Sequence, residues 1–175
     1  YCSRVCCMYS IKNALLIQSE LPNVEINIFY IDLRAFGKNY EQFLTKAKAS
    51  GINFIKAKPV IKGTGKGNNV ILRYEDQEKA EGIVEEEYEL VVLSLAIIPA
   101  WSPDGKVAVD MSDDGFMSAS FPKISPALTK TRGVFIAGVA SGPKDIVDTI
   151  IEAGAAAMEA SNYIKELERG DTKAA

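Results

Sequence analysis

An alternation of helix and strand patterns near the start of the chain constrains the fold most. Residues 8–20 repeat apolar side chains at helical spacing, and Pro22 and Asn23 end that pattern. Residues 24–33 (VEINIFYIDL) alternate at first and then become continuously apolar, which is typical of a strand covered on both faces. A second helix is predicted at 40–50, and its inward face is formed by Phe43, Leu44 and Ala47. This alternation favours an α/β layer with parallel strands.

The middle of the chain has a different pattern. Residues 52–61, 69–74 and 82–87 are short strand candidates separated by polar turns, which predicts an antiparallel meander. The glycine-rich residues 63–67 (GTGKG) lie between two strand candidates, whereas a phosphate-binding loop lies between a strand and a helix. We therefore interpret this loop as a hairpin connection.

The rest of the chain carries two more apolar strand candidates and a long helix. Residues 88–98 (YELVVLSLAII) predict a core strand that ends at Pro99, and strand fragments are expected around a turn at 112–115. Residues 133–138 (GVFIAG) predict another strand. After a short loop, a helix is predicted at 145–167.

Composition excludes some classes of partner. Charged residues make up 25% of the 175 residues, the formal net charge is -3, and no basic cluster is present, so a nucleic-acid partner is not expected. No apolar run approaches the roughly 20 residues needed to span a bilayer, and no signal peptide is recognisable. We expect a soluble, cytoplasmic protein. Because the chain starts at Tyr1 on a cysteine cluster, we also expect a piece of a longer polypeptide.

All three cysteines of the chain, Cys2, Cys6 and Cys7, lie within six residues. Clustered thiols suit soft-metal ligation, and thiolates are the usual ligands of iron–sulfur clusters. A [4Fe–4S] cluster needs four ligands, so a fourth must come from elsewhere. Two alternatives stay open at this point. The cysteines are simply small buried residues, or they form a redox-active dithiol.

The second candidate site is the corner between the strand at 133–138 and the helix that follows. A glycine lets a flat ring approach the backbone closely, and a helix N-terminus exposes N–H groups that suit an electron-rich ligand. An ordinary strand–helix packing unit with small side chains explains the same pattern. Both interpretations stay open on these residues alone.

Three motifs resemble the heterodisulfide reductase A-subunit family over nearly the whole chain: YCSRVCCMYSIKNALL, YIDLRAFGKNYEQF and GVFIAGVASGPKDI. TRGVFIAG also resembles the last flavin-contacting motif of flavoprotein reductases with two dinucleotide-binding domains, and residues 89–94 (ELVVLS) resemble their connecting motif. The resemblance implies an α/β, Rossmann-like, three-layer nucleotide-binding fragment with an antiparallel β-meander. Residues 1–100 would be a nicotinamide-type domain that lacks its first strand, and residues 101–175 the C-terminal part of an FAD-binding domain.

The resemblance also implies an oxidoreductase that contains FAD and iron–sulfur clusters and transfers electrons to partner subunits of a heterodisulfide reductase-like complex. Three ligands of one [4Fe–4S] cluster would be Cys2, Cys6 and Cys7. The flavin-binding residues would be Gly138, Val139, Lys144, Asp145 and Ile146. We expect the isolated piece to be inactive and to bind neither cofactor fully, because the fingerprint G-x-G-x-x-G is absent from it.

The sequence departs from the flavoprotein pattern where Val139 replaces the aspartate that usually contacts the ribityl chain. Two other functions therefore stay open: a scaffold that docks partner redox subunits without binding a cofactor, and a thiol–disulfide oxidoreductase that uses Cys6 and Cys7. Adjacent cysteines form a strained ring on oxidation, which disfavours the second of these. Exposed strand edges would also permit pairing with a second copy of the chain.

Overall fold

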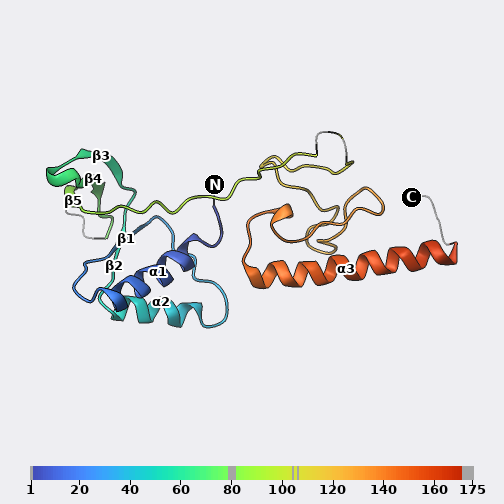
Figure 1. Cartoon of the computed structure of the whole chain (residues 1–175), viewed down its shortest axis with the longest axis horizontal. Coiled ribbons are helices and arrows are strands. Elements are labelled where there is room, and N and C mark those ends of the chain that lie inside the picture. The colour runs from blue at the N-terminus through green and yellow to red at the C-terminus, as the bar shows by residue number, and fades with distance from the viewer. Residues whose placement is uncertain (1, 79–81, 104, 106, 171–175) are drawn as a thin grey trace. The chain divides into compact units, whose positions relative to one another are not determined.

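The structure is a computed structural model that describes residues 2–78, 82–103, 105 and 107–170. The chain forms two compact units (Figure 1). One unit is Cys6–Leu95, and the other consists of Tyr1–Val5 and Ala96–Ala175. The first residues of the chain thus belong to the C-terminal unit. The assignment of nicotinamide-type and flavin-type domains at residues 1–100 and 101–175 stays a prediction.

Two helices form one layer of the unit Cys6–Leu95. They are α1 (Cys6–Glu20) and α2 (Tyr40–Ala49), and both predicted helices are confirmed. Their inward side chains share one core because apolar residues recur at helical spacing in both helices. The buried residues of this core are Ile11, Ala14, Leu44, Ala47 and Ile52. Phe43, also predicted to point inward, is partly buried against the same core.

A parallel pair of strands forms the middle layer of this unit. β1 (Asn27–Tyr30) pairs with β2 (Asn53–Lys56), as the alternation of helices and strands predicted. Successive side chains point to opposite faces: Ile28 packs against the helical core, and Phe29 packs against the antiparallel sheet. The predicted coverage of both strand faces is confirmed. The strand is shorter than residues 24–33, and its side chains are half-buried.

The third layer is an antiparallel meander in the order β3 (Val60–Thr64), β4 (Val70–Glu75) and β5 (Ile83–Tyr88), as predicted for its second and third strands. The predicted first strand, residues 52–61, is divided instead: its first half is β2 of the parallel pair, and β3 begins at Val60. β3 and β4 are joined through a short 3-10 turn η1 (Lys66–Asn68), so the glycine-rich loop is a hairpin connection. A Cβ atom on Gly65 would meet the carboxylate of Glu87 at 2.6 Å. A carboxylate beside this loop opposes the binding of a phosphate.

An aromatic cluster joins the middle layer to the meander. The Phe29 ring packs edge-on against Tyr74, with ring centroids 4.8 Å apart, and also against Tyr88. The hydroxyl groups of both tyrosines donate to the same oxygen, Oε2 of Glu86, at 2.8 and 2.5 Å. Burial and this carboxylate together raise the pKa of Tyr74 to about 12 and also raise the pKa of Tyr88. Both hydrogen bonds to Glu86 therefore require that the tyrosine hydroxyl groups are protonated.

The C-terminal unit contains one long helix and a set of loops. Helix α3 (Ile146–Arg169) confirms the predicted helix, with Asp145 as its N-cap and Gly170 as its left-handed C-cap. The turn at 112–115 is confirmed as well, since Met111 and Met117 bridge across it. Across the described parts of the chain, no helix is long and apolar enough to cross a membrane.

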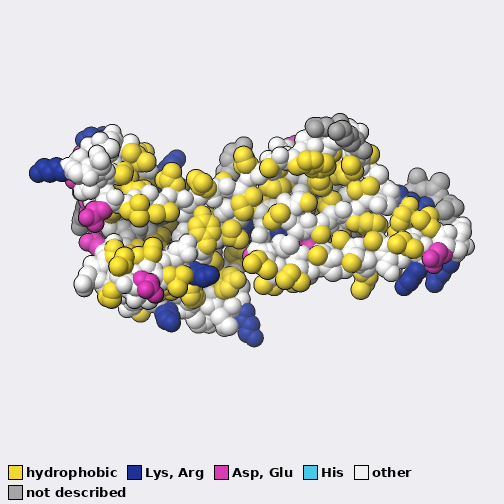
Figure 2. Space-filling model, in the orientation of Figure 1, with side chains coloured by type: hydrophobic (Ala, Val, Ile, Leu, Met, Phe, Trp, Pro, Cys, Tyr) yellow, Lys and Arg dark blue, Asp and Glu magenta, His cyan; other side chains and the backbone are white. Residues whose placement is uncertain are grey.

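Two strand predictions are wrong. Residues 89–98 are extended but belong to no strand, and their side chains Leu90, Val92, Leu93, Leu95 and Ile98 are exposed. Residues 133–138 make one isolated bridge, between Phe135 and Leu128, instead of a strand. A strand requires a hydrogen-bonded neighbour, and among the described residues none is paired with either segment beyond that bridge. Hydrophobic side chains accordingly spread over the visible surface, including the region of α3 (Figure 2).

Candidate cofactor-binding site

The helix-terminal corner at residues 138–145 connects the apolar segment 133–138 to α3. It begins with a 3-10 turn, η2 (Gly138–Ser141), and ends at the N-cap Asp145, whose Oδ1 accepts from the Asp148 N–H at 2.8 Å. Gly138 is buried and has φ +62, and a Cβ atom there would lie 2.8 Å from Cγ2 of Thr149. Glycine is thus required at this position for close packing of the corner onto α3.

A nearly buried ion pair lies inside the corner. The Lys144 Nζ lies 2.6 Å from Oε1 of Glu152, and the two side chains are 9% and 21% exposed. Lys144 also donates to the Ser141 hydroxyl at 2.8 Å. The second oxygen of Glu152 accepts from the backbone N–H of Gly138 at 2.9 Å. The ammonium of Lys144 and the N–H of Gly138 are therefore both engaged within the protein.

Sequence reasoning identified Lys144 but missed Glu152. The available signal was an acidic residue in the second turn of a helix whose neighbours are apolar or small (IIEAGAAA). A glutamate among such residues is typical of a partnered charge, because an unpaired buried carboxylate is costly. Its partner could not be identified from spacing alone, since the loop before α3 decides where Lys144 points.

The outer surface of the corner is apolar. Val139 is exposed, and Ile146 in the first turn of α3 is 78% exposed. The N–H groups of a helix's first turn have no intrahelical carbonyl partners. Exposed apolar side chains beside such donors fit the edge of a flat aromatic ring system such as a flavin. The predicted flavin-binding residues thus divide into an outer set, Val139 and Ile146, and inner residues that brace the loop.

The cysteines lie where the chain passes from one unit to the other. All three are reduced thiols; Cys2 is exposed, whereas Cys6 and Cys7 are half-buried in the first turn of α1. Arg4 has a left-handed backbone conformation, φ +64, and its N–H donates to Sγ of Cys2 at 3.3 Å. The thiol of Cys7 approaches the carbonyl oxygen of Asp32 at 3.9 Å.

These thiols fit an iron–sulfur cluster in the chemistry of their donor atoms. Soft thiolates are its usual ligands, and N–H donors to the cluster's sulfur atoms, such as the one at Cys2, tune its reduction potential. Three cysteines are one ligand short of the usual four. Among the described residues, no three cysteine or carboxylate side chains are already gathered to hold a metal ion.

An ion pair connects the cysteine segment to the helix-terminal corner. Arg4, between Cys2 and Cys6 in the sequence, lies 2.6 Å from the carboxylate of Asp148 in the first turn of α3. Both residues belong to the same unit. Two surface hollows lie elsewhere. One is lined by Pro99, Ala100, Trp101, Ser102, Met111 and Gly115, and the other lies between α1 and α2.

Known proteins resemble this chain closely in sequence, although no family model matches it. The iron-sulfur A-subunit 1 of CoB–CoM heterodisulfide reductase from Methanopyrus kandleri is 45% identical over 167 residues, which cover 92% of this chain and 25% of that protein. The iron-sulfur A-subunit of CoB–CoM heterodisulfide reductase from Methanocaldococcus jannaschii is 44% identical over 168 residues, with the same coverage. By sequence, this chain belongs to the heterodisulfide reductase A-subunit family.

The chain spans about a quarter of the length of these heterodisulfide reductase relatives. Among more distant relatives, the A-subunit of the ferredoxin/F420H2-dependent CoB–CoM heterodisulfide reductase from Methanosarcina acetivorans is 35% identical over 162 residues, or 91% of this chain and 20% of that protein. The predicted family is therefore confirmed.

A solved structure confirms the fold class. Thioredoxin reductase of Lactococcus lactis, in its FR conformation, superimposes with a TM-score of 0.60 at 20% identity, covering 89% of this chain and 50% of that one. This segment of the heterodisulfide reductase family thus has the α/β fold of flavoprotein reductases with two dinucleotide-binding domains. The roles of the individual site residues stay predictions.

Proposed function

We propose that this chain is the part of a heterodisulfide reductase-like subunit that brings an iron–sulfur cluster and a flavin into one electron-transfer site. The observation that carries this proposal is the ion pair between Arg4 and Asp148. It links Arg4, next to Cys2 and Cys6 in the sequence, to the first turn of α3, although its side chains are 39% and 36% exposed. The segment that carries Cys2 is thereby connected to the helix-terminal corner within one unit, whereas Cys6 and Cys7 belong to the other unit.

Each cofactor has its own set of residues in this proposal. Cys2, Cys6 and Cys7 are three ligands of a [4Fe–4S] cluster, and the fourth ligand comes from outside this chain. The outer residues Val139 and Ile146 contact the flavin ring, and the inner residues Gly138, Lys144 and Asp145 shape its site. Bound FAD would exchange electrons one or two at a time, and the cluster would carry single electrons.

The chain's own groups prepare this site in two ways. The N–H of Arg4, held in place by the left-handed backbone of that residue, donates to Sγ of Cys2 and orients this sulfur as a ligand. The Asp148 N–H of the first turn of α3 is bound by the Asp145 carboxylate, and the other N–H groups of that turn would stabilise negative charge on a neighbouring ring. Electrons then pass to other subunits of the complex. We propose that this complex is cytoplasmic.

The test uses the full-length subunit, purified without oxygen, and measures iron content and the visible spectrum. We expect flavin bands and a broad iron–sulfur absorption. Cys6→Ser should remove most of the iron and leave the flavin bands. Arg4→Met should lower iron retention modestly, at most about three-fold, because the segment between two ligands loses a partly exposed ion pair.

Lys130→Met is the matched control, because Lys130 forms an exposed ion pair with Asp110 in the same unit. This variant should keep the iron content of the unmodified protein. A colourless, iron-free full-length subunit would contradict the proposed function. If Arg4→Met and Lys130→Met retained equal iron, the proposed role of the Arg4–Asp148 ion pair would be contradicted. The proposal that the three cysteines bind a cluster would not be affected.

A further inference from the structure

The structure assigns Lys144 and Glu152 a positioning role: as a charge-compensated pair, they fix the backbone at Gly138 and set the local charge beside the flavin. This inference rests on the proposed function and goes beyond it. The predicted role of Lys144 was direct contact with the cofactor. The Lys144 side chain instead pairs with Glu152 inside the corner. The two residues therefore act on the flavin indirectly, by fixing the backbone of the corner.

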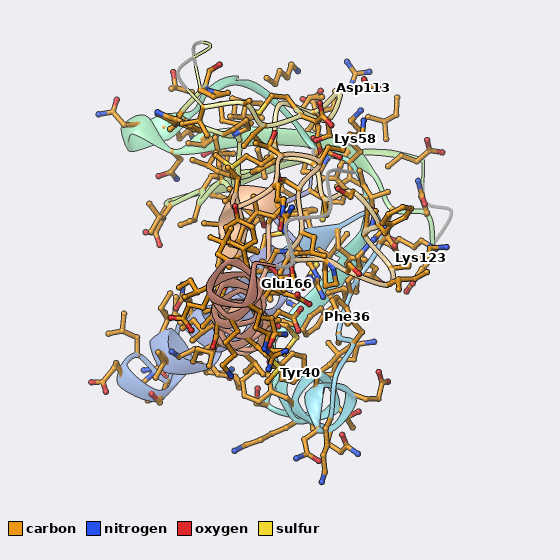
Figure 3. All side chains as sticks on the ribbon, turned by 90° about the vertical axis from the view of Figure 1, so that its right-hand side faces the viewer. Phe36, Tyr40, Lys58, Asp113, Lys123 and Glu166 are labelled. Carbon is orange, nitrogen blue, oxygen red and sulfur yellow. The ribbon has the colours of Figure 1, made fainter. Side chains whose placement is uncertain are left out.

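The pair differs in kind from a surface ion pair on the same helix. Near the end of α3, Arg132 lies 3.5 Å from Glu166, and these side chains are 39% and 55% exposed. Figure 3 looks along α3 and labels Glu166. The Lys144–Glu152 distance is 2.6 Å, and Lys144 is almost fully buried. Exposed pairs contribute little, whereas a buried charge without its partner is strongly unfavourable.

The pair holds both polar groups of the Gly138 backbone. Glu152 accepts from the Gly138 N–H at 2.9 Å. The Ser141 hydroxyl, which accepts from Lys144, donates to the Gly138 carbonyl at 3.2 Å. Removal of either charge therefore loosens the residue from which the outer residue Val139 extends. An apolar pair of the same size would fill the space but would leave the buried Gly138 N–H without its acceptor.

The two charges also compensate each other electrically. Reduction places negative charge on a flavin, so a nearby positive charge raises its midpoint potential and a negative charge lowers it. Lys144→Met leaves the Glu152 carboxylate uncompensated and should lower the potential. Glu152→Gln leaves the Lys144 ammonium uncompensated and should raise it. The double variant should return towards the unmodified value, since both charges are then absent.

The experiment is an anaerobic spectroelectrochemical titration of the flavin in the full-length subunit. The variants are Lys144→Met, Glu152→Gln, their combination, and the conservative Lys144→Arg, which keeps the charge. Glu166→Gln is the matched control, because it neutralises an acid in an exposed pair on the same helix. We expect opposite shifts for the two single variants, partial recovery in the double variant, near-native behaviour for Lys144→Arg, and no shift for the control.

The outcomes separate this inference from the proposed function. If the unmodified subunit binds flavin and the two single variants shift its potential in the same direction, or leave it unchanged, the pairing role is overturned and the proposed function stands. If the unmodified subunit binds no flavin, both fail together. Loss of flavin from Lys144→Met does not end the test, since the isosteric Glu152→Gln still reports the sign of the charge effect and Lys144→Arg, which keeps the charge, should leave the potential near its native value.

Discussion

Replacing Gly138 by alanine tests whether the corner is packed as tightly as its geometry indicates. Gly138 has φ +62, in the left-handed region that disfavours a side chain. The new Cβ atom would also lie 2.8 Å from Cγ2 of Thr149, which is closer than normal contact. The other nearby atoms of Thr149, Cβ and Oγ1, are both 3.7 Å away. The steric cost of Gly138→Ala therefore comes from contact with a single methyl group, Cγ2 of Thr149.

The magnitude of the effect has two parts. The left-handed backbone costs an alanine about 1–2 kcal/mol. Overpacking against a fixed neighbour costs roughly 1–3 kcal/mol more. Gly138→Ala should therefore lower the free energy of unfolding of the C-terminal unit by about 2–5 kcal/mol. In a Thr149→Ser background the methyl group is absent, and the same change should cost only about 1–2 kcal/mol.

The assay is urea denaturation of this chain followed by the fluorescence of Trp101. Trp101 is the sole tryptophan and lies in the same unit as Gly138. Thr149→Ser retains the hydroxyl that donates to the Asp145 carbonyl at 2.8 Å, so this background is a fair reference. An equal cost of Gly138→Ala in both backgrounds, or no cost in either, would refute the packing argument.

Two further effects on stability follow from the same structure. Gly154 is exposed in α3, and a Cβ atom there would meet open space. Gly154→Ala should therefore raise the free energy of unfolding by about 1 kcal/mol in the same urea assay. A lower free energy of unfolding would show that the position is not open. The raised pKa of Tyr74, about 12, means that its stabilising contribution is present below pH 10 and is lost as the pH rises from 10 through 12. Tyr74→Phe should therefore show a smaller alkaline loss of stability than the unmodified chain in urea titrations followed by circular dichroism, and an identical loss would exclude this role.

The candidate site was only partly predictable from sequence. The cysteine positions and the corner before α3 were evident, because clustered thiols and a glycine followed by a helix start are local patterns. Glu152 was not evident, since its link to Lys144 depends on how eight residues of loop and helix fold back on each other. The anchor between Arg4 and Asp148 joins positions 144 residues apart (148 − 4) and depends wholly on tertiary structure.

The sequence by itself determined the helices α1, α2 and α3 and the hairpin between β3 and β4. These elements close their hydrogen bonds between near neighbours, so apolar spacing, caps and turn residues are enough to specify them. Only the tertiary structure decided the fate of residues 89–98 and 133–138. An apolar run has strand character in the sequence, but it becomes a strand only where another backbone lies alongside it, and that is a property of the assembled fold.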